Sequence, residues 1–532
     1  MINKIQIQNF RVFKDIVVSF DDGMNLIVGD NDSGKSTLLE AIHLVLTKRV
    51  GRTWFDTELS PHYFNRSATD EYVAAAAQGR SPTLPEIVID LYLSDDDEFA
   101  SLKGKNNLLF EDAPGLRVRA FFDGAFADAY EQFLATGSIS MIPTEYYRVE
   151  WKSFADQPVT AREIPVAASV IDASTIRLQS GVDYHVQRII SGHLEDKERA
   201  ELARAYRSLQ EVFAETPSVK QVNEKLRNTR IGASSRELSI AVDVSSSAAW
   251  DRSLVPHFDE LPFQLIGKGA QSSLKVLLAL RRAVEASHVV LIEEPENHLS
   301  PASLSQLLKQ IEVECEGSQV IATTHSSFVL NKLGLSDLIL LNDQSTLRLT
   351  NLPEDTLNYF KKLPGYDTLR LVLAERAILV EGPSDELVLQ RAYLDAYGKM
   401  PLDDGIEVIC IRGLSCKRFL DIAKPLEKRV AAVVDNDGKS KDQIEASFSN
   451  YIDVDFIEVH FGDAADGNTL EPQIASANDL DVLNGIFGTE YGDKEALSAY
   501  MSRRKTECAL KIFESAQKIE MPRYLRKAIG AE

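Results

Sequence analysis

Several features are scarce in this sequence, and each scarcity excludes a class of protein. The chain has four cysteines in 532 residues, and none of them forms a CxxC pair (Cys315, Cys410, Cys416 and Cys508). A disulfide scaffold is thereby excluded, and reduced thiols in a cytoplasmic protein are predicted.

Long apolar runs are scarce as well. The apolar runs are short, such as VLLAL at 276–280 and VVLI at 289–292. A membrane helix needs about 20 apolar residues, so no span is expected, and the start MINKIQIQNF lacks the apolar core of a signal peptide.

Positive charge is also scarce. The chain has 58 Lys and Arg against 80 Asp and Glu, which gives a net charge of −22. Nucleic-acid-binding proteins usually carry a basic surface, and the overall charge does not supply one. Residues 502–532 differ, because they hold eight Lys and Arg against four Glu. This segment either binds phosphates locally or is a solvated helix face, and the sequence leaves both interpretations open.

The remaining composition is that of an ordinary globular protein, and its patterns predict an α/β fold. Hydrophobic residues make up 44% and charged residues 26%, and the length corresponds to three or four domains of about 150 residues. Alternation predicts strands at 2–8, 24–29, 86–93, 145–152 and 238–244, a helix at 36–49, and a loop-like stretch at 51–83. Buried strands alternate with helices from 263 to 341 and again from 377 past 471, which is typical of parallel sheets covered by helices.

Two stretches are predicted to be mainly helical. Residues 193–228 are charged and rich in Ala and Leu, and Pro217 divides them into two helices. This pair is either a projecting dimerisation arm or a plain solvent-facing pair of helices. The last sixty residues are also predicted to be mostly helical.

A phosphate-binding loop is predicted at residues 29–37. The segment from Gly29 to Thr37 fits the pattern GxxxxGK[ST], follows the strand NLIVG and opens the helix STLLEAIHLVL. The glycines allow backbone N–H groups to wrap phosphates at a helix N-terminus. Lys35 would reach the β and γ phosphates and Ser36 would hold Mg²⁺. The candidate nucleotide-binding residues of the loop are Asn31, Asp32, Ser33, Gly34, Lys35, Ser36 and Thr37.

A buried strand that ends in two carboxylates forms the second half of the predicted ATPase site. The segment HVVLIEEP places Glu293 and Glu294 at the carboxyl end of a strand, where ligands bind in parallel sheets. Glu293 would stand near Mg²⁺, and Glu294 would polarise the attacking water.

Order and content together resemble the ABC ATPases of the SMC/RecF type. The segment IGKGAQS at 266–272, with Gly269 and Gln271, resembles the signature loop that caps the γ-phosphate bound by a second subunit. His325 ends the strand QVIATTH, where that family carries its switch histidine. The start Asn9-Phe10-Arg11 matches the group as well and implies that Arg11 contacts nucleotide. Two departures put fast turnover in doubt: Glu293 replaces the usual Asp, and no Q-loop glutamine is evident.

Carboxylates gather at the predicted strand ends of the second α/β unit. Glu381 follows the strand AILV, with Asp385 four residues further on, and Asp435 and Asp437 follow the strand VAAVV. Acids at strand ends are often plain turn formers, but together these four can converge on one sheet edge. Such a set suits Mg²⁺ or Mn²⁺, and two ions could support phosphodiester cleavage. Glu471 in NTLEP is a plausible fifth ligand.

The pattern EGxxD followed by DxD resembles the Toprim domain, and an ABC ATPase joined to a C-terminal Toprim domain resembles the OLD (overcoming lysogenisation defect) nucleases. Lys505, in the segment KTECAL, fits the lysine that these nucleases carry beyond the Toprim core and could neutralise the scissile phosphate. The layout implied is an ATPase domain at 1–165 and 236–350, a helical insertion at 166–235, a connector at 351–370, a Toprim domain at 371–475, and a helical extension at 476–532 that completes the nuclease site.

The resemblance implies DNA cleavage that depends on Mg²⁺ or Mn²⁺ and is coupled to ATP, with a dimer or larger oligomer and a role in phage defence. Some relatives act with a helicase-like partner and others with the DNA of a retron. An alternative is a RecF-like ATP-operated clamp whose Toprim domain does not cut DNA. A topoisomerase would need a tyrosine on a separate domain, and a primase would need further domains that this chain lacks.

Overall fold

The computed structural model describes residues 1–51, 53–78, 83–135, 139–161, 163–164, 166–172, 178–179, 182–183, 194–227, 240, 257–271, 273–274, 276–277, 280, 289–297, 299–342, 345–349, 352–363, 367–412 and 416–531. They form two units, one of Met1–Pro165 with Ile321–Glu532 and the other of Val166–Val320. The predicted α/β class is confirmed, since strands and helices alternate through both units. The predicted strand at 238–244 lies outside the described residues, apart from Ile240. No described helix combines the length and the apolar content that a membrane crossing requires.

The first unit opens with an antiparallel sheet built from the alternating segments. Its strands follow the order β2–β1–β6–β8–β7, and β9 pairs with β8. Ile5 and Ile7 of β1 are fully buried and lie opposite Val18 and Ile16 of β2, so apolar side chains meet on one face. The strands are β1 (Ile2–Phe10), β2 (Phe13–Ser19), β6 (Ile87–Leu93), β7 (Lys103–Gly104), β8 (Ala113–Phe122) and β9 (Tyr147–Ser153). The predicted strands 2–8, 86–93 and 145–152 are thereby confirmed.

The loop-like prediction for residues 51–83 was wrong over its middle. Residues Arg66–Ala77 form the helix α2, and the Asn65 side chain caps its start by accepting hydrogen bonds from the N–H groups of Ser67 and Ala68. Asn65 was read as a loop residue, whereas asparagine at this place is a favoured helix cap. The other short elements are β4 (Arg49–Val50), β5 (Thr53–Trp54), η1 (Pro61–Tyr63), η2 (Asp97–Leu102), η3 (Gly124–Phe126), α3 (Ala127–Ala135) and η4 (Thr144–Tyr146).

A second sheet of the first unit carries the phosphate-binding loop. Strand β3 (Met24–Val28) runs parallel to β17 (Leu338–Asn342), and Leu26 lies opposite Leu338. Strand β18 (Ser345–Arg348) pairs antiparallel with β17. On the other side of β3 lies β16 (Gln319–Thr323), at the boundary of the two units. The helix α1 (Lys35–Thr47) follows the loop after β3 and buries Leu38, Ile42 and Val45.

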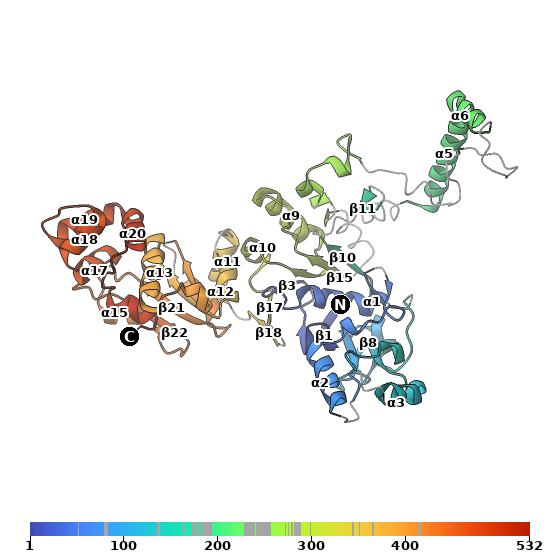
Figure 1. The fold of residues 1–532 in the computed structure, drawn as a ribbon, viewed down its shortest axis with the longest axis horizontal. Helices are drawn as coiled ribbons and strands as arrows, with labels where there is room; N and C mark the ends of the chain where they lie inside the picture. Colours follow the sequence, from blue (N-terminus) through green and yellow to red (C-terminus); the bar gives the residue numbers. More distant parts are fainter. Residues whose placement is uncertain are drawn as a thin grey trace. The chain divides into compact units, whose positions relative to one another are not determined.

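The second unit contains the predicted helical pair. Helices α5 (Asp196–Glu215) and α6 (Pro217–Arg227) contact each other and are coloured green in Figure 1. Strand β10 (Ala168–Asp172) is parallel to β15 (Val289–Glu293). The remaining described elements of this unit are β11 (Leu178–Gln179), β12 (Val182–Asp183), β13 (His257–Phe258), β14 (Leu261–Pro262), η5 (Phe263–Leu265) and α9 (Pro301–Glu314).

The connector joins the ATPase part of the first unit to the C-terminal region through buried polar contacts. Its helices are α11 (Glu354–Lys362) and α12 (Thr368–Leu373), and α10 (Ser327–Leu333) precedes them. The Thr368 hydroxyl donates to Asn331 Oδ1 at 2.6 Å, and both residues are almost fully buried. The Thr356 hydroxyl donates to Asp421 at 2.5 Å. These bonds fix α12 to α10 and α11 to the helix that carries Asp421.

The C-terminal region is a parallel sheet covered by helices. Its strands follow the order β20–β19–β21–β22, and all neighbours are parallel. The elements are β19 (Arg376–Val380), α13 (Pro383–Tyr397), η6 (Pro401–Asp404), β20 (Ile406–Cys410), α14 (Cys416–Ala423), β21 (Arg429–Val434), α15 (Lys441–Ser447), α16 (Ser449–Ile452), β22 (Ile457–Phe461), α17 (Leu470–Ala477), α18 (Leu480–Phe487), α19 (Lys494–Arg503), α20 (Lys505–Glu514) and α21 (Arg523–Ala528). The predicted helical ending is confirmed.

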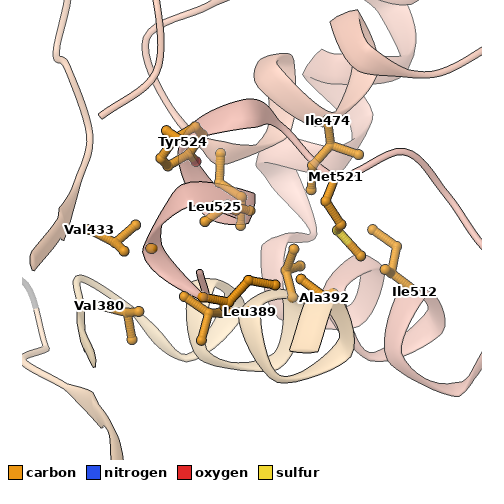
Figure 2. Packing of buried hydrophobic residues seen from close by; sticks show 14 of the residues in the cluster. Val380, Leu389, Ala392, Val433, Ile474, Ile512, Met521, Tyr524 and Leu525 are labelled. Atoms are coloured by element: carbon orange, nitrogen blue, oxygen red, sulfur yellow. The ribbon is translucent and has the colours of Figure 1, made fainter. Parts of the chain in front are cut away.

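One apolar core unites the sheet with the last helices. Figure 2 shows Val380 and Val433 of the sheet in the same buried cluster as Leu389 of α13, Ile512 of α20 and Leu525 of α21. Burying each such side chain contributes about 1.5–3 kcal/mol. The helices after residue 476 are therefore part of the domain that carries the predicted carboxylates, and they set where Lys505 stands.

Candidate functional site

The predicted carboxylates lie at one edge of the C-terminal sheet. Glu381 follows β19 directly, and Asp435 follows its parallel neighbour β21. The Asp435 N–H donates to Glu381 Oε1 at 3.0 Å, so the two strand ends are tied together. Asp385 lies in the first turn of α13, where its carboxylate accepts from the Gly382 N–H at 3.0 Å. The structure thus brings together acids that are 54 residues apart in the chain.

Burial and mutual repulsion raise the pKa of these acids. Burial, followed by the Glu381 and Glu471 carboxylates, raises the pKa of Asp385 to about 6. Burial, followed by the Asp385 and Glu381 carboxylates, raises the pKa of Asp435 to about 7, against a lowering by Lys505. Burial also raises the pKa of Glu381, which the Asp435 N–H lowers and the Asp437 carboxylate raises further. Charged carboxylates held this closely favour protons or cations.

Glu471 and Lys505 complete the cluster from the helical extension. Glu471 lies in the first turn of α17 and is only 3% exposed. Its carboxylate accepts from the Thr469 hydroxyl at 3.1 Å and lies 3.5 Å from Lys505 Nζ. Lys505 is the first residue of α20, and its side chain is 51% exposed. A half-exposed ammonium beside buried acids is available to a ligand that enters from solvent.

The predicted ligand Asp437 lies in a turn that is stabilised by its neighbour Asn436. Asp437 has a φ of 50° and its N–H donates to the Asn468 carbonyl at 3.3 Å. Asn436, which is 1% exposed, donates to the carbonyls of Gly462 and Gly467 and accepts from the Gly438 N–H. Asn436 therefore fixes the backbone on which both aspartates stand. No local pattern indicates this role, because the partners of Asn436 at Gly462 and Gly467 are 26 and 31 residues away.

Tyr524 is a second residue near the acids that no local sequence pattern indicates. It is 6% exposed in α21 and belongs to the buried cluster in Figure 2. Burial raises the pKa of Tyr524 well above its usual range, and the carboxylates of Asp385, Asp435, Glu471 and Glu381 raise it further. Its hydroxyl thus stays protonated within the electric field of the acids.

The carboxylate donors of this cluster fit a hard divalent cation. Carboxylate oxygens that repel one another are the ligands that Mg²⁺ and Mn²⁺ prefer. Across the described ranges, however, no three His, Cys, Asp or Glu side chains converge as metal ligands do. Glu381 Oε1, for example, is engaged by the Asp435 N–H. The metal ligands Glu381, Asp385, Asp435, Asp437 and Glu471 therefore stay a prediction.

The phosphate-binding loop has the geometry that its pattern predicts. Gly34 has a φ of 97°, and a Cβ there would lie 2.5 Å from the Phe13 ring, so only glycine fits. Lys35 is buried, and its Nζ donates to the carbonyls of Gly29 at 2.9 Å and Asp30 at 2.7 Å. Ser33 Oγ is buried without a hydrogen-bond partner among the described residues. A phosphate group would accept from both side chains, so the loop fits a nucleotide.

Arg11 and Thr37 lie at the same cavity beside this loop. The cavity measures about 560 Å³ and is also lined by Ser60, His62 and Tyr63. The Arg11 guanidinium forms an ion pair with Glu40 of α1 at 2.8 Å, which orients the guanidinium toward α1. The cavity is large enough for a small ligand, which is consistent with the predicted contact of Arg11 with nucleotide.

His325 belongs to the same unit as Lys35. The Thr324 N–H donates to the Ile27 carbonyl of β3 at 3.2 Å, which places the backbone before His325 beside the strand that precedes the phosphate-binding loop.

The turn of the phosphate-binding loop is closed by its own backbone. Asp32 has a φ of 64°, and the Asp30 carbonyl accepts from the Ser33 N–H at 3.2 Å. Asn31, Ser36 and Thr37 complete the turn into α1.

The other predicted ATPase residues belong to the second unit. Glu293 ends β15, and Glu294 has a φ of 43° and accepts from Asn297 Nδ2 at 2.8 Å. Residues 268–271, which include Gly269, are helical. The Gln271 side chain donates to the carbonyls of Gln264 at 3.3 Å and Ile266 at 2.8 Å, so it stiffens its own loop. Their joining with Lys35 in one site stays a prediction.

Comparisons with known families match three segments of the chain. Residues 1–113 match the AAA ATPase domain, and residues 194–331 match the AAA domain described with the AbiEii toxin of type IV toxin–antitoxin systems. Residues 372–437 match the Toprim domain of proteins like the overcoming lysogenization defect protein. That segment contains Glu381, Asp385, Asp435 and Asp437. The chain has the domain architecture of the OLD family. It carries ATPase domains followed by an OLD-like Toprim domain, as the sequence predicted.

Individual relatives cover only parts of the chain. The DNA replication and repair protein RecF of Bacillus cytotoxicus is 41% identical over 58 residues, which is 11% of this chain and 16% of that protein. RecF of Bacillus thuringiensis is 40% identical over the same share. An SMC head bound to the C-terminal winged-helix domain of ScpA covers 66% of this chain and 98% of its own, with 14% identity and a TM-score of 0.36. RecF bound to an ATP analogue covers 66% and 98%, with 13% identity and a TM-score of 0.33. These scores are too low to carry an inference about function.

Proposed function

We propose that this chain is a metal-dependent DNA endonuclease whose cutting is regulated by its ATPase part. The observation that carries the proposal is the cluster of acids at the ends of β19 and β21, inside an OLD-like Toprim domain. Burial and the mutual repulsion of negative charges raise the pKa values of Asp385 and Asp435, and a bound cation would relieve that repulsion. An ATPase domain implies ATP as a cofactor. The endonuclease activity, the Mg²⁺ or Mn²⁺ and a role in phage defence are parts of the proposal.

Each residue of the cluster has a part in the proposed reaction. Divalent cations bound by the five carboxylates would activate water and neutralise the leaving oxygen. Glu381 and Asp435 hold the two strand ends in register, and Asn436 fixes the turn between Asp435 and Asp437. Lys505 would exchange its contact with Glu471 for an oxygen of the scissile phosphate, where added negative charge develops in the transition state. Its half-exposed side chain supports that exchange.

DNA and a second copy of the chain are the proposed partners, with a helicase-like protein or retron DNA as further ones. Residues 502–532 supply local positive charge in an acidic chain, which supports DNA contact. Helix α5 exposes apolar side chains, with Leu209 68%, Val212 65% and Phe213 46% exposed. Exposed apolar surface of this kind marks interaction sites, which supports self-association through residues 196–227. The domain boundaries given above are part of the same proposal.

Plasmid nicking tests the function. Purified protein is incubated with supercoiled plasmid and Mg²⁺ or Mn²⁺, with and without ATP. The wild type should give open circles, and EDTA should stop the reaction. Glu381→Gln and Asp435→Asn should each lose most of the activity, and the double variant should lose little more because the acids act as a unit. Glu445→Gln is the matched control, since Glu445 lies in α15 of the same domain with a side chain that is 43% exposed and has no part in the cluster of acids.

The same assay separates the alternative function. A RecF-like clamp that does not cut DNA would leave the plasmid supercoiled under every metal condition while it binds DNA in the presence of ATP. If Glu381→Gln nicks the plasmid at the wild-type rate, the proposed site is wrong.

A further inference from the structure

A cavity at the opposite edge of the C-terminal sheet has no part in the proposed reaction. It measures about 620 Å³ and lies over the starts of the strands and the end of α21; we call it the strand-start cavity, and its lining is Arg376, Arg429, Val430, Ala431, Asp455, Phe456, Glu458, His460, Lys527 and Gly530. Parallel strands advance about 3.3 Å per residue. Asp435 follows Arg429 by six residue steps, so Arg429 at the start of β21 lies roughly 20 Å along the strand from that carboxylate.

Two polar residues of β22 line this cavity, Glu458 and His460. Glu458 and His460 lie opposite Ala431 and Val433 of β21, so they share the face that the helices cover further along. Val433 is packed into the core together with α21. Ala431 is small and its neighbours on β22 are polar, and α21 ends at Ala528. Polar and charged side chains therefore make up most of the lining, and Phe456 is its one aromatic residue.

Positive charges from three elements converge on this space. Arg376 and Arg429 are the first residues of β19 and β21 and lie directly opposite each other. Like charges in that arrangement destabilise a sheet unless an anion or another partner compensates them. Arg376 donates to the Ala528 carbonyl at 2.9 Å. Within the described part of the chain, the side chains of Arg429 and Lys527 make no hydrogen bond or ion pair, and both residues are exposed.

The acidic residues of the cavity compensate these charges only in part. Glu458 lies 2.8 Å from His460 Nε2, and Asp455 is exposed in the turn that precedes β22. The lining therefore contains two carboxylates against two arginines, one lysine and one histidine. In a chain with a net charge of −22, an excess of cations that line one cavity is a local feature that attracts anions.

We propose that the strand-start cavity is a phosphate-binding site. Arg429 and Lys527 would hold a phosphate group, Arg376 would add a third cation, and the half-buried Phe456 would contact the rest of the ligand. Arginine and lysine are the usual phosphate partners. The phosphate comes either from a free nucleotide or from a nucleic-acid backbone, and the chemistry of the cavity is the same for both. The inference does not depend on the proposed nuclease activity.

Calorimetric titration with inorganic pyrophosphate tests the site. The Lys35→Ala variant serves as the background, because it silences the phosphate-binding loop, and EDTA keeps divalent cations away from the carboxylates. Pyrophosphate should bind at one site per chain. Adding Arg429→Gln and Lys527→Gln should weaken binding at least tenfold. The control adds Lys309→Gln and Lys441→Gln instead. This pair removes the same charge at exposed positions that do not line the cavity, and it should change the affinity less than twofold.

Competition identifies the source of the phosphate. Displacement of pyrophosphate by thymidine 5′-phosphate would indicate a free nucleotide, and displacement by a twelve-nucleotide single strand without terminal phosphates would indicate a nucleic-acid backbone. Displacement by neither would restrict the site to small inorganic phosphates. Absence of pyrophosphate binding in the Lys35→Ala background would overturn the proposal, and so would an equal loss in the control. Circular dichroism should show that all variants are folded.

Discussion

Replacing Asn436 by alanine should loosen the turn that carries Asp435 and Asp437. The Asn436 side chain makes three hydrogen bonds, to the carbonyls of Gly462 at 3.1 Å and Gly467 at 2.8 Å and from the Gly438 N–H at 2.8 Å. Each such bond contributes about 0.5–1.5 kcal/mol net, and buried groups left without partners cost more. We therefore expect Asn436→Ala to lower the local opening free energy by about 3 kcal/mol.

Hydrogen exchange measured by mass spectrometry is the suitable assay, because a chain of several domains does not unfold in one transition. About 3 kcal/mol corresponds to a loss of protection of roughly a hundredfold. It should appear in peptides that cover residues 435–438 and 462–468, and affinity for Mn²⁺ should fall with it. Asn450→Ala is the matched control, since Asn450 is exposed. A change in protection below about threefold in Asn436→Ala would refute the reasoning.

Three further outcomes are expected. Lys35→Ala should abolish ATP binding in a filter or calorimetric assay while the fold is kept, and normal binding would remove residues 29–37 from the nucleotide site. Because the pKa values of Asp385 and Asp435 are raised to about 6 and about 7, protons compete with metal below those values. Mn²⁺ affinity should thus rise from pH 5.5 to pH 8 with proton release, and equal affinities would contradict this. Lys505→Ala should bind Mn²⁺ and DNA normally yet nick plasmid about a hundredfold more slowly, and an unchanged rate would show that Lys505 is only a surface residue.

The parts of the fold that could be predicted from the sequence are those set by local patterns. The strand β3, the glycines of the loop and the helix α1 are neighbours in the chain, so one motif contains the information for all three. The strand ends that carry Glu381 and Asp435 were predictable for a similar reason. Each strand is a short apolar run that stops at an acid, and parallel pairing brings such ends to one edge.

The parts that were missed depend on contacts between distant residues. The Asn65 side-chain amide donates to the carbonyls of Arg11 and Val12, which are 54 and 53 residues away, and these contacts orient its oxygen to cap α2. Asn436 gains its importance only from the carbonyls of Gly462 and Gly467, which are 26 and 31 residues away. Tyr524 reaches the field of the acids because α21 folds back onto the sheet, and no local pattern encodes that return.

Anomalous diffraction from crystals soaked in MnCl₂ tests the central claim most directly, because it locates the cation itself. We predict difference peaks within about 2.5 Å of carboxylate oxygens of Glu381, Asp385 and Asp435. These acids would have to close around the ion from their present positions. The peaks should disappear in Asp435→Asn. Crystals that show Mn²⁺ only at other positions, or none at all at saturating metal, would contradict the account.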